Sequence, residues 1–580
     1  MPGEALLAKQ AGGLETTDAT QEVVEVQGER FVKAVRFTIR KASEASNTTQ
    51  LNLENTTVIK KGDALVATFW VRGNKMDGKS PAQLAFLFEK STPPWTHSIF
   101  RPIHMAREGK TWKCVRIVFA AVEDYAAGQA MVSLRLAYGP QTVEIADFSV
   151  INLGPGKSAE EICRLNAVAN PLPEAVVQVN FNEHRQTIDG FGGNFCQARY
   201  GKTDKIDPVG QYNLDHLNGV MARVGVPLNY YTPEPGIYKK DRQAKAAFEL
   251  MQELARRQIP MIASVWEGPL WMLPGKVEEG GRVLAPERYD DCIAALIHFL
   301  VTARDDYHAP VDFFSFNEPD LGVNFKFTPS EMATFIRQAG PRFKAAGLTT
   351  KFLVGDTAFG VNLVDYATPL LADTTLAPYL GPLAFHCWDA MGASEGGYRA
   401  LADLGQMYHR PILCTEVGHD AQLYQQPNPW PSWENALRLV AVYARTFRLT
   451  GASVMLYWTY QNNYPLVTPN GQQPYPAFEV IQMLEKAFPK GSVVCSSAYE
   501  CEGLQVLAAR GPEGKGETVL LVNTVGAGTV TVKGLPLGKK VHCQTLKAAS
   551  EPQAAASVTG RNDAVVIRLP ARSVTLLTME

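Results

Sequence analysis

The sequence predicts a multidomain protein in which a (β/α)8 TIM barrel is flanked by an N-terminal jelly-roll-like β-sandwich and a C-terminal β-sandwich. At 580 residues the chain is too long for a single hydrophobic core. Residues 185–490 alternate short apolar runs with amphipathic helical segments, and eight such units match the size and pattern of a TIM barrel. On both sides of this range the pattern changes to short strands alone. An open doubly wound sheet is the alternative, but the range holds no phosphate-binding glycine loop.

The composition argues against several classes of partner. A net charge of −2, with 46% hydrophobic and 20% charged residues, is ordinary for a globular protein and offers no field that would gather nucleic acid or anionic lipid. No apolar run is long enough for membrane insertion. The segment 1–7 lacks the basic and then apolar pattern of a signal peptide, although a signal removed before Met1 would leave the same sequence. Cys495 and Cys501 are close enough in sequence to pair, but we expect isolated thiols.

The N-terminal part of the chain is predicted to form a tail and a sandwich. Residues 1–20 are small and polar without periodicity, which predicts a mobile tail. Residues 21–155 alternate apolar with polar residues in short runs separated by turns, which is typical of a β-sandwich. Clear runs are Phe31–Ile39, Asp63–Val71 and Trp112–Phe119. The layout resembles the jelly-roll carbohydrate-binding modules, and a spacer sandwich that binds no ligand is the alternative.

Three further segments complete the predicted domain plan. Residues 156–175 form a linker with a short helical stretch, and residues 176–184 form a strand that joins the C-terminal sandwich. Residues 491–580 return to the strand pattern, as in Leu504–Ala509 and Thr518–Asn523. They predict a second small β-sandwich packed beside the barrel.

The fourth predicted barrel strand ends in the first candidate catalytic residue. Residues 311–316 form an apolar run typical of a buried parallel strand, and Pro319 cannot continue it. Glu318 therefore lies at the carboxyl end of the strand, where barrel enzymes place their sites. The same rule selects the side chains that end other strands. They are Glu267, Asn317, Asp356, His386, Glu416, Trp458 and Tyr460.

Glu318 has a counterpart in Glu416, which ends the seventh strand. The fourth and seventh strands of an eight-stranded barrel face each other across its mouth, so two long side chains there can converge. Retaining glycosidases require two carboxyl groups about 5 Å apart, one as nucleophile and one as acid/base. In such a pair, the charge of the ionised nucleophile keeps its neighbour protonated and able to donate.

The tryptophans also gather at the predicted strand ends. Six of the nine fall there or in the loops that follow, namely Trp266, Trp271, Trp388, Trp430, Trp433 and Trp458. Aromatic faces stack on the apolar faces of sugar rings, so this distribution favours a carbohydrate-binding site. Packing that caps the barrel is the alternative explanation for some of them.

Three motifs carry a resemblance to a known group of enzymes. They are Ile-Asp-Gly-Phe-Gly-Gly at 188–193, Asn-Glu-Pro at 317–319 and Thr-Glu at 415–416, on the first, fourth and seventh strands. The chain resembles clan A glycoside hydrolases over about residues 177–580. It is most similar to glycoside hydrolase family 30, with family 39 and family 79 as neighbours.

The resemblance implies a role for each of five residues. Glu318 would be the acid/base and Glu416 the nucleophile. Asn317 would hydrogen-bond the sugar 2-hydroxyl, and Arg223 on the second strand would keep the nucleophile ionised. His386 would touch the nucleophile, although a satisfied core histidine is an equal alternative for it.

The chain departs from family 30 after the third strand. That family usually shows Ser-Pro-Pro-x-Trp-Met there, whereas this chain has Trp266–Met272 with a third acid, Glu267. We expect Glu267 to contact substrate or to lie at the rim, and Asp356 to form a turn. The predicted substrate-binding set is Asn317, Arg223, His386, Trp458, Trp266, Glu267, Tyr460, Trp271 and Trp388.

The expected activity is that of a retaining β-glycoside hydrolase that uses no metal and no cofactor. The resemblance implies a β-linked glycan of plant cell-wall type as substrate and a secreted or periplasmic enzyme, with a cytoplasmic location left open. A non-catalytic carbohydrate-binding protein with a degenerate barrel is the alternative. A lysine-dependent lyase or aldolase is disfavoured because no strand ends in lysine. The sugar, endo or exo action and the oligomeric state stay open.

Overall fold

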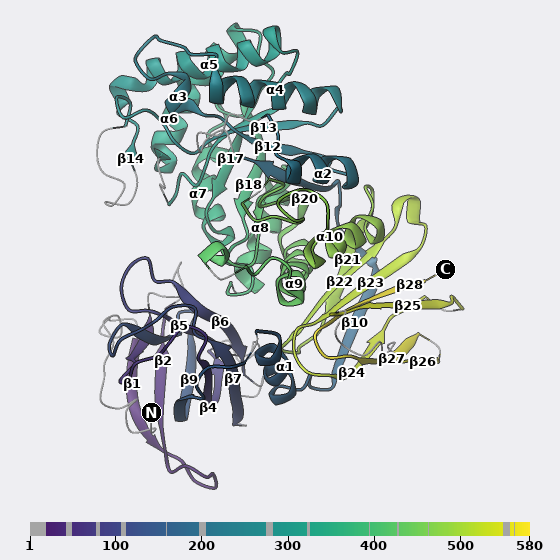
Figure 1. The fold of residues 1–580 in the computed structure, drawn as a ribbon. Helices are drawn as coiled ribbons and strands as arrows, with labels where there is room; N and C mark the ends of the chain where they lie inside the picture. Colours follow the sequence, from purple (N-terminus) through teal and green to yellow (C-terminus); the bar gives the residue numbers. More distant parts are fainter. Residues whose placement is uncertain are drawn as a thin grey trace.

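The computed structural model contains the predicted barrel between two regions of β-structure (Figure 1). It describes residues 19–41, 49–76, 82–105, 112–157, 159–196, 205–273, 282–321, 325–393, 395–425, 428–461, 463–536, 538–548, 557–561 and 563–579. Most of the predicted tail, residues 1–18, lies outside these ranges, and strand β1 begins at Ala19. Among the helices in these ranges, none combines the length and apolar character that crossing a bilayer requires.

Eight parallel strands close into the barrel, which confirms the predicted fold class. They are β11 (Gly190–Phe195), β12 (Ala222–Gly225), β13 (Met261–Val265), β15 (Phe313–Phe316), β17 (Lys351–Thr357), β18 (Leu380–His386), β19 (Ile412–Val417) and β20 (Ala452–Tyr457). The ring closes where β11 pairs with both β12 and β20. Apolar side chains that include Ile262, Leu413 and Leu456 fill its interior, so the barrel is a packed core and not a channel.

Helices surround the barrel and begin where the sequence supplies caps. The main ones are α2 (Pro208–His216), α4 (Arg242–Arg256), α5 (Tyr289–Asp306), α6 (Pro329–Ala345), α7 (Leu363–Ala372), α8 (Glu395–Met407), α9 (Trp433–Thr450) and α10 (Pro476–Ala487). Thr328 and Glu331 form a capping box at the start of α6. Gly451 ends α9 in the left-handed conformation that glycine adopts at low cost.

The N-terminal region is a sandwich of two antiparallel sheets (purple and blue in Figure 1). One sheet has the order β1 (Ala19–Glu25), β2 (Lys33–Ile39), β9 (Gln141–Asn152), β4 (Ala64–Lys75) and β7 (Lys113–Ala120). The other has the order β3 (Gln50–Glu54), β8 (Ala130–Arg135), β5 (Gln83–Lys90) and β6 (His97–His104). Phe69, Phe86 and Phe148 pack together between them, because alternate side chains of each strand face inward.

The C-terminal region differs from a sandwich of two separate sheets. Its strands form one nine-stranded sheet in the order β25 (Val541–Leu546), β28 (Ser573–Met579), β23 (Glu517–Asn523), β22 (Leu504–Arg510), β21 (Val493–Ala498), β10 (Ala175–Thr187), β24 (Gly528–Lys533), β27 (Ala564–Leu569) and β26 (Ser557–Arg561). Strand β10 follows the linker helix α1 (Ala159–Ala169) and pairs with β21 on one side and β24 on the other. It therefore joins the two halves that enclose one shared apolar core. Cys495 and Cys501 in this region are free thiols.

Charged side chains join the three regions at one place. Arg101 and Lys113 of the N-terminal sandwich pair with Glu502, which lies between β21 and β22. On α9, Glu434 binds Arg438 and also pairs with Arg572 of the C-terminal sheet. Burial, and after it the neighbouring charge of Arg101, lower the pKa of Lys113 to about 8. The half-buried pairs with Glu502 therefore hold the N-terminal sandwich beside the C-terminal sheet.

The glycines of β11 make room for a side chain of the eighth unit. A Cβ atom on Gly193 would lie 2.2 Å from the ring of Tyr460, and one on Gly192 would lie 2.1 Å from the carbonyl oxygen of Met221. The Tyr460 ring also packs edge-to-face on Phe195. The glycine motif of the first strand is thus required by close packing below the barrel mouth.

We predict that Gly193→Ala destabilises the protein by about 1–3 kcal/mol, because the new methyl group overlaps the Tyr460 ring. Thermal unfolding measures the effect. Gly396→Ala is the matched control, since it lies in α8 with open space around it and should be neutral or stabilising. If the two variants have equal melting temperatures, the packing explanation is wrong.

Candidate active site

Glu318 is held just beyond the end of β15 in an unusual backbone conformation. Its φ angle is 48°, in the left-handed region that non-glycine residues seldom adopt. A hydrogen bond of 3.1 Å from its backbone N–H to the carbonyl oxygen of Asp356 fixes this turn. The side chain is 13% exposed, so the carboxyl group is accessible at the barrel mouth. Backbone strain of this kind is common where a side chain must be aimed.

Glu416 ends the facing strand β19 and is held at both carboxylate oxygens. Arg223 Nη1 donates to Oε1 at 2.8 Å, and Trp388 Nε1 donates to Oε2 at 3.2 Å. The side chain is 5% exposed. Two donors therefore orient a buried carboxylate that belongs to a rigid strand.

His386 lies between the two glutamates. Its Nδ1 is 3.0 Å from Glu318 Oε1 and 3.4 Å from Glu416 Oε2, while Nε2 is 3.4 Å from Asp356 Oδ1. One ligand atom of each of Glu318, His386 and Glu416 lies within 4.8 Å of the others. The structure thus brings the two predicted glutamates together, with carboxylate oxygens at most 4.8 Å apart.

Arg223 is the centre of the hydrogen-bond network beneath this pair. Nη1 donates to Asn194 Oδ1 at 3.1 Å in addition to Glu416. Nη2 donates to Asn317 Oδ1 and to Asp356 Oδ2, each at 2.7 Å. The guanidinium is fully buried and stacks on the Trp266 ring at 4.1 Å. Its charge is compensated by two carboxylates, as a buried charge requires.

We expected Asp356 to form a turn, but it lies within strand β17. It is fully buried and accepts hydrogen bonds from Ser315 Oγ at 2.7 Å and Thr415 Oγ1 at 2.5 Å, as well as from Arg223. Sequence reasoning assigned no role to Asn194, Ser315 or Thr415. All three are polar residues near the ends of otherwise apolar strands, and this feature of the sequence could have identified them.

The ionisation of the cluster follows from burial and from these charges. Burial alone would lower the pKa of His386, but Glu416, Asp356 and Glu318 outweigh it and raise that pKa to about 10. Burial raises the pKa of Glu416, while His386 and Arg223 oppose the rise. Against the effect of its burial, Arg223 and His386 hold the pKa of Asp356 well below its usual range.

Aromatic side chains surround the pair, as the tryptophan pattern predicted for this end of the barrel. The rings of Trp266 and Trp458 lie 5.8 Å apart, and Trp388 lies 6.1 Å from Tyr464. Trp271 lies further along the third loop and donates to the Thr232 carbonyl oxygen.

Two other predicted residues, Glu267 and Tyr460, have contacts with neighbouring side chains of the barrel. Glu267 accepts a hydrogen bond of 3.4 Å from Asn229. Tyr460 is 1% exposed and packed against Gly193 and Phe195, so its position gives no support to a substrate contact.

The histidine and two glutamates have a spacing that a metal ion can bridge. The same carboxylates raise the pKa of His386 to about 10, which favours a protonated imidazole between them. Nδ1 is within hydrogen-bond distance of Glu318, whereas Nε2 lies 3.4 Å from Asp356 Oδ1 as an ion-pair contact without hydrogen-bond geometry. The arrangement fits proton chemistry between two carboxyl groups.

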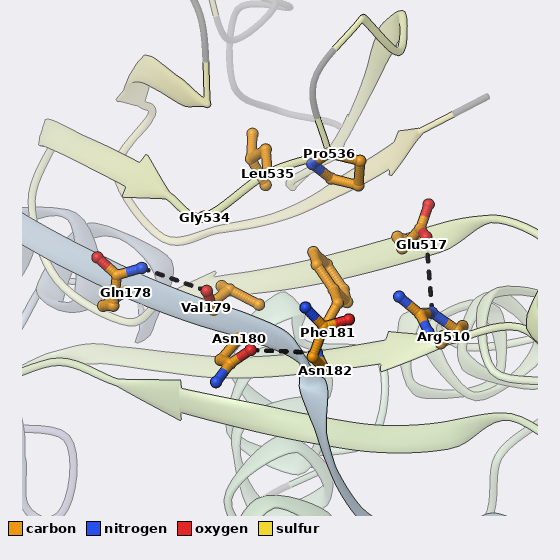
Figure 2. A pocket seen from close by; sticks show the side chains of 10 residues that line it. All are labelled: Gln178, Val179, Asn180, Phe181, Asn182, Arg510, Glu517, Gly534, Leu535 and Pro536. Carbon is orange, nitrogen blue, oxygen red and sulfur yellow. Dashed lines mark hydrogen bonds and ion pairs between the residues drawn. The ribbon is translucent and has the colours of Figure 1, made fainter.

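A separate cavity of about 480 Å³ lies on the C-terminal sheet (Figure 2). Phe181, Leu535 and polar side chains of β10 line it. Its carboxylate, Glu517, pairs with Arg510 and with Lys539. The cavity lacks a second acid among the residues that line it, so it does not reproduce the chemistry of the barrel mouth.

The sequence matches no family model and no curated protein. Solved structures of glycoside hydrolase family 30 are similar in fold. The subfamily 8 xylanase from Clostridium acetobutylicum has 18% identity and a TM-score of 0.54, over 70% of this chain and 99% of that one. The endoxylanase from Clostridium papyrosolvens has 18% identity and a TM-score of 0.53 over the same shares. The catalytic domain of xylanase C from Talaromyces cellulolyticus has 19% identity and a TM-score of 0.50, over 70% and 100%.

We predict that His386 contributes a pH-dependent part of the stability. Its pKa is about 10 in the folded protein and about 6.5 in the unfolded chain. The contribution is therefore fully present below about pH 6.5 and is lost as the pH rises through about 10. Urea unfolding of the wild type and of His386→Gln across this pH range measures this contribution. The difference between their free energies of unfolding should become smaller as the pH rises. His216→Gln, on the exposed end of α2, is the control, and parallel wild-type and His386→Gln profiles would contradict the assignment.

Proposed function

We propose that the protein is a retaining β-glycoside hydrolase with Glu416 as nucleophile and Glu318 as acid/base. The observation that carries this proposal is the distance of at most 4.8 Å between carboxylate oxygens of the two glutamates. Retaining enzymes need carboxyl groups about 5 Å apart, whereas inverting enzymes keep about 6.5–9.5 Å for a water molecule. The similarity of fold to family 30 xylanases supports the same reaction.

In the first step a carboxylate oxygen of Glu416 forms a bond to the anomeric carbon. The bond from that carbon to the glycosidic oxygen breaks, and Glu318 transfers its proton to the departing oxygen. His386 Nδ1 lies 3.0 Å from Glu318 Oε1, which leaves Oε2 to face the departing oxygen. The leaving sugar departs as an alcohol, and a glycosyl ester remains on Glu416.

In the second step Glu318, now ionised, removes a proton from water. The water oxygen attacks the anomeric carbon, the ester bond to Glu416 breaks, and the sugar leaves with its original anomeric configuration. Arg223 and Trp388 stabilise the departing carboxylate through their hydrogen bonds. Because Arg223 holds Asn317 Oδ1, the Nδ2 group of Asn317 is the donor offered to a sugar hydroxyl.

The surface around the pair suits a long glycan. Apart from Met407, the large apolar side chains that are exposed on the described part of the barrel follow carboxyl ends of strands. They are Tyr230, Ile237, Leu270, Val283, Leu321, Phe359 and Tyr424. Exposed apolar side chains gathered on one face mark a binding surface. We infer a β-linked polysaccharide of plant cell-wall type as substrate, and a secreted enzyme.

We predict that Glu416→Gln abolishes turnover of every aryl β-glycoside that the wild type cleaves, because the amide cannot attack the anomeric carbon. Glu318→Gln should lower kcat by about 10²–10⁴-fold, most strongly for poor leaving groups. A panel of 4-nitrophenyl and phenyl β-glycosides of xylose, glucose, galactose and glucuronic acid measures both, since phenol is the poorer leaving group. Glu479→Gln, exposed on α10, is the matched control. Full turnover by Glu416→Gln would refute the assignment.

A mechanism-based label separates this proposal from a non-catalytic sugar-binding barrel. A 2-deoxy-2-fluoro β-glycoside should leave a glycosyl group on the peptide that contains Glu416, detectable by mass spectrometry. The label should be absent in Glu416→Gln. If the wild type binds a β-glycan but neither cleaves it nor becomes labelled, the protein is a non-catalytic sugar-binding protein.

A further inference from the structure

The N-terminal sandwich touches the barrel at the loop that follows β19. His97 Nε2 lies 3.3 Å from Asp420 Oδ1. Gln422 Nε2 donates to the Pro94 carbonyl oxygen at 3.2 Å. Pro94 and His97 belong to the turn and the strand start between β5 and β6, so the tip of this hairpin reaches the barrel loop that leaves the nucleophile strand.

The same sheet of the sandwich also touches the loop that follows β18. Gln83 Nε2 donates to the Gly392 carbonyl oxygen at 3.4 Å, and a Cβ on Gly392 would lie 3.1 Å from the Phe100 ring. Both barrel loops lie at carboxyl ends of strands, which is the face that carries the catalytic pair. The sandwich therefore abuts the barrel mouth and not its opposite end.

A continuous set of aromatic contacts runs from the nucleophile to this interface. Trp388 donates to Glu416 and lies 6.1 Å from the Tyr464 ring. The Tyr464 ring lies 5.1 Å from Trp430 and 6.3 Å from Tyr424, and its hydroxyl donates to the Ala421 carbonyl oxygen at 2.7 Å. The segment that Tyr464 anchors is the one that His97 and Gln422 join to the sandwich.

Two aromatic side chains remain exposed where this path ends. Tyr424 is 58% exposed on the barrel side, and Trp95 is 50% exposed on the sandwich side, next to Pro94. Trp95 has a φ angle of 49°, which is rare for a bulky residue. A large apolar ring held outward in this conformation is typical of a binding position.

We propose that Trp95 and Tyr424 form a distal binding platform for the glycan whose cleaved bond lies at Glu318 and Glu416. The sandwich would then be a fixed part of the substrate-binding surface and not an independently moving module. Its position is held by the ion pairs of Arg101 and Lys113 with Glu502 and by the His97–Asp420 pair. This inference rests on the proposed glycosidase activity and adds that sugar units beyond the reacting one bind across two domains.

The test compares short and long substrates of the same sugar. The short one is the 4-nitrophenyl β-glycoside that the wild type cleaves best, and the long one is the β-linked hexasaccharide of that sugar. We expect Trp95→Ala to leave kcat/KM for the short substrate unchanged and to lower it about tenfold for the hexasaccharide, since one lost stacking contact has about that effect. Trp95→Phe should keep most of the wild-type value, because it retains an aromatic face.

Two controls exclude indirect effects. Val32→Ala replaces another exposed apolar residue, near the other sheet of the sandwich, and should change neither value. Calorimetry with the inactive Glu416→Gln protein measures hexasaccharide binding without turnover. Adding Trp95→Ala to this protein should raise the Kd about tenfold. Tyr424→Ala should have the same length-dependent effect as Trp95→Ala.

The outcomes separate this inference from the proposed function. A wild type that cleaves none of the four 4-nitrophenyl β-glycosides and no matching hexasaccharide overturns both. Activity on both substrates, with Trp95→Ala equal to the wild type on the hexasaccharide, overturns the platform and leaves the glycosidase. Equal losses on the short and long substrates also overturn the platform, because they indicate disturbance of the catalytic centre.

Discussion

The buried guanidinium of Arg223 constrains everything at the barrel mouth. A charge with no access to water requires acceptors for its hydrogens and carboxylates to balance it. Four side chains from four different strand ends supply these, and three of them are Asn194, Asn317 and Asp356. The fourth is the carboxylate of Glu416. The contacts that compensate the buried charge of Arg223 therefore also fix the position of the Glu416 carboxylate, the candidate nucleophile.

His386 extends this constraint from one glutamate to the other. Because Asp356 is kept ionised by Arg223, it can stabilise a positive imidazole beside it, and that imidazole faces both glutamates. The two glutamates therefore share one imidazole, whose Nδ1 lies 3.0 Å from Glu318 and 3.4 Å from Glu416. An acid that shares its surroundings with an ionised carboxylate is the arrangement that double displacement needs.

The arrangement of the domains also places the N-terminal sandwich beside the barrel mouth. The two β-regions beside the barrel differ in how they are attached to it. The C-terminal sheet continues through β10 into the barrel chain, whereas the N-terminal sandwich contacts the barrel through hydrogen bonds of side chains. The charged junction around Glu502 and Glu434 fixes the N-terminal sandwich where its β5–β6 hairpin meets the loop after β19. A module in that position shapes what the barrel mouth can bind.

The sequence by itself determined the barrel, the order of its strands and the two glutamates, because period-two and period-3.6 patterns are local and Pro319 marks where a strand ends. It also supplied His386 through its place at a strand end, and Arg223 only through resemblance. It could not reveal that Asp356 is a buried partner of Arg223, that Tyr460 fills the space left by Gly193, or that the C-terminal strands form one sheet. Each of these depends on contacts between residues far apart in the chain, and only the tertiary structure decides which strand ends meet.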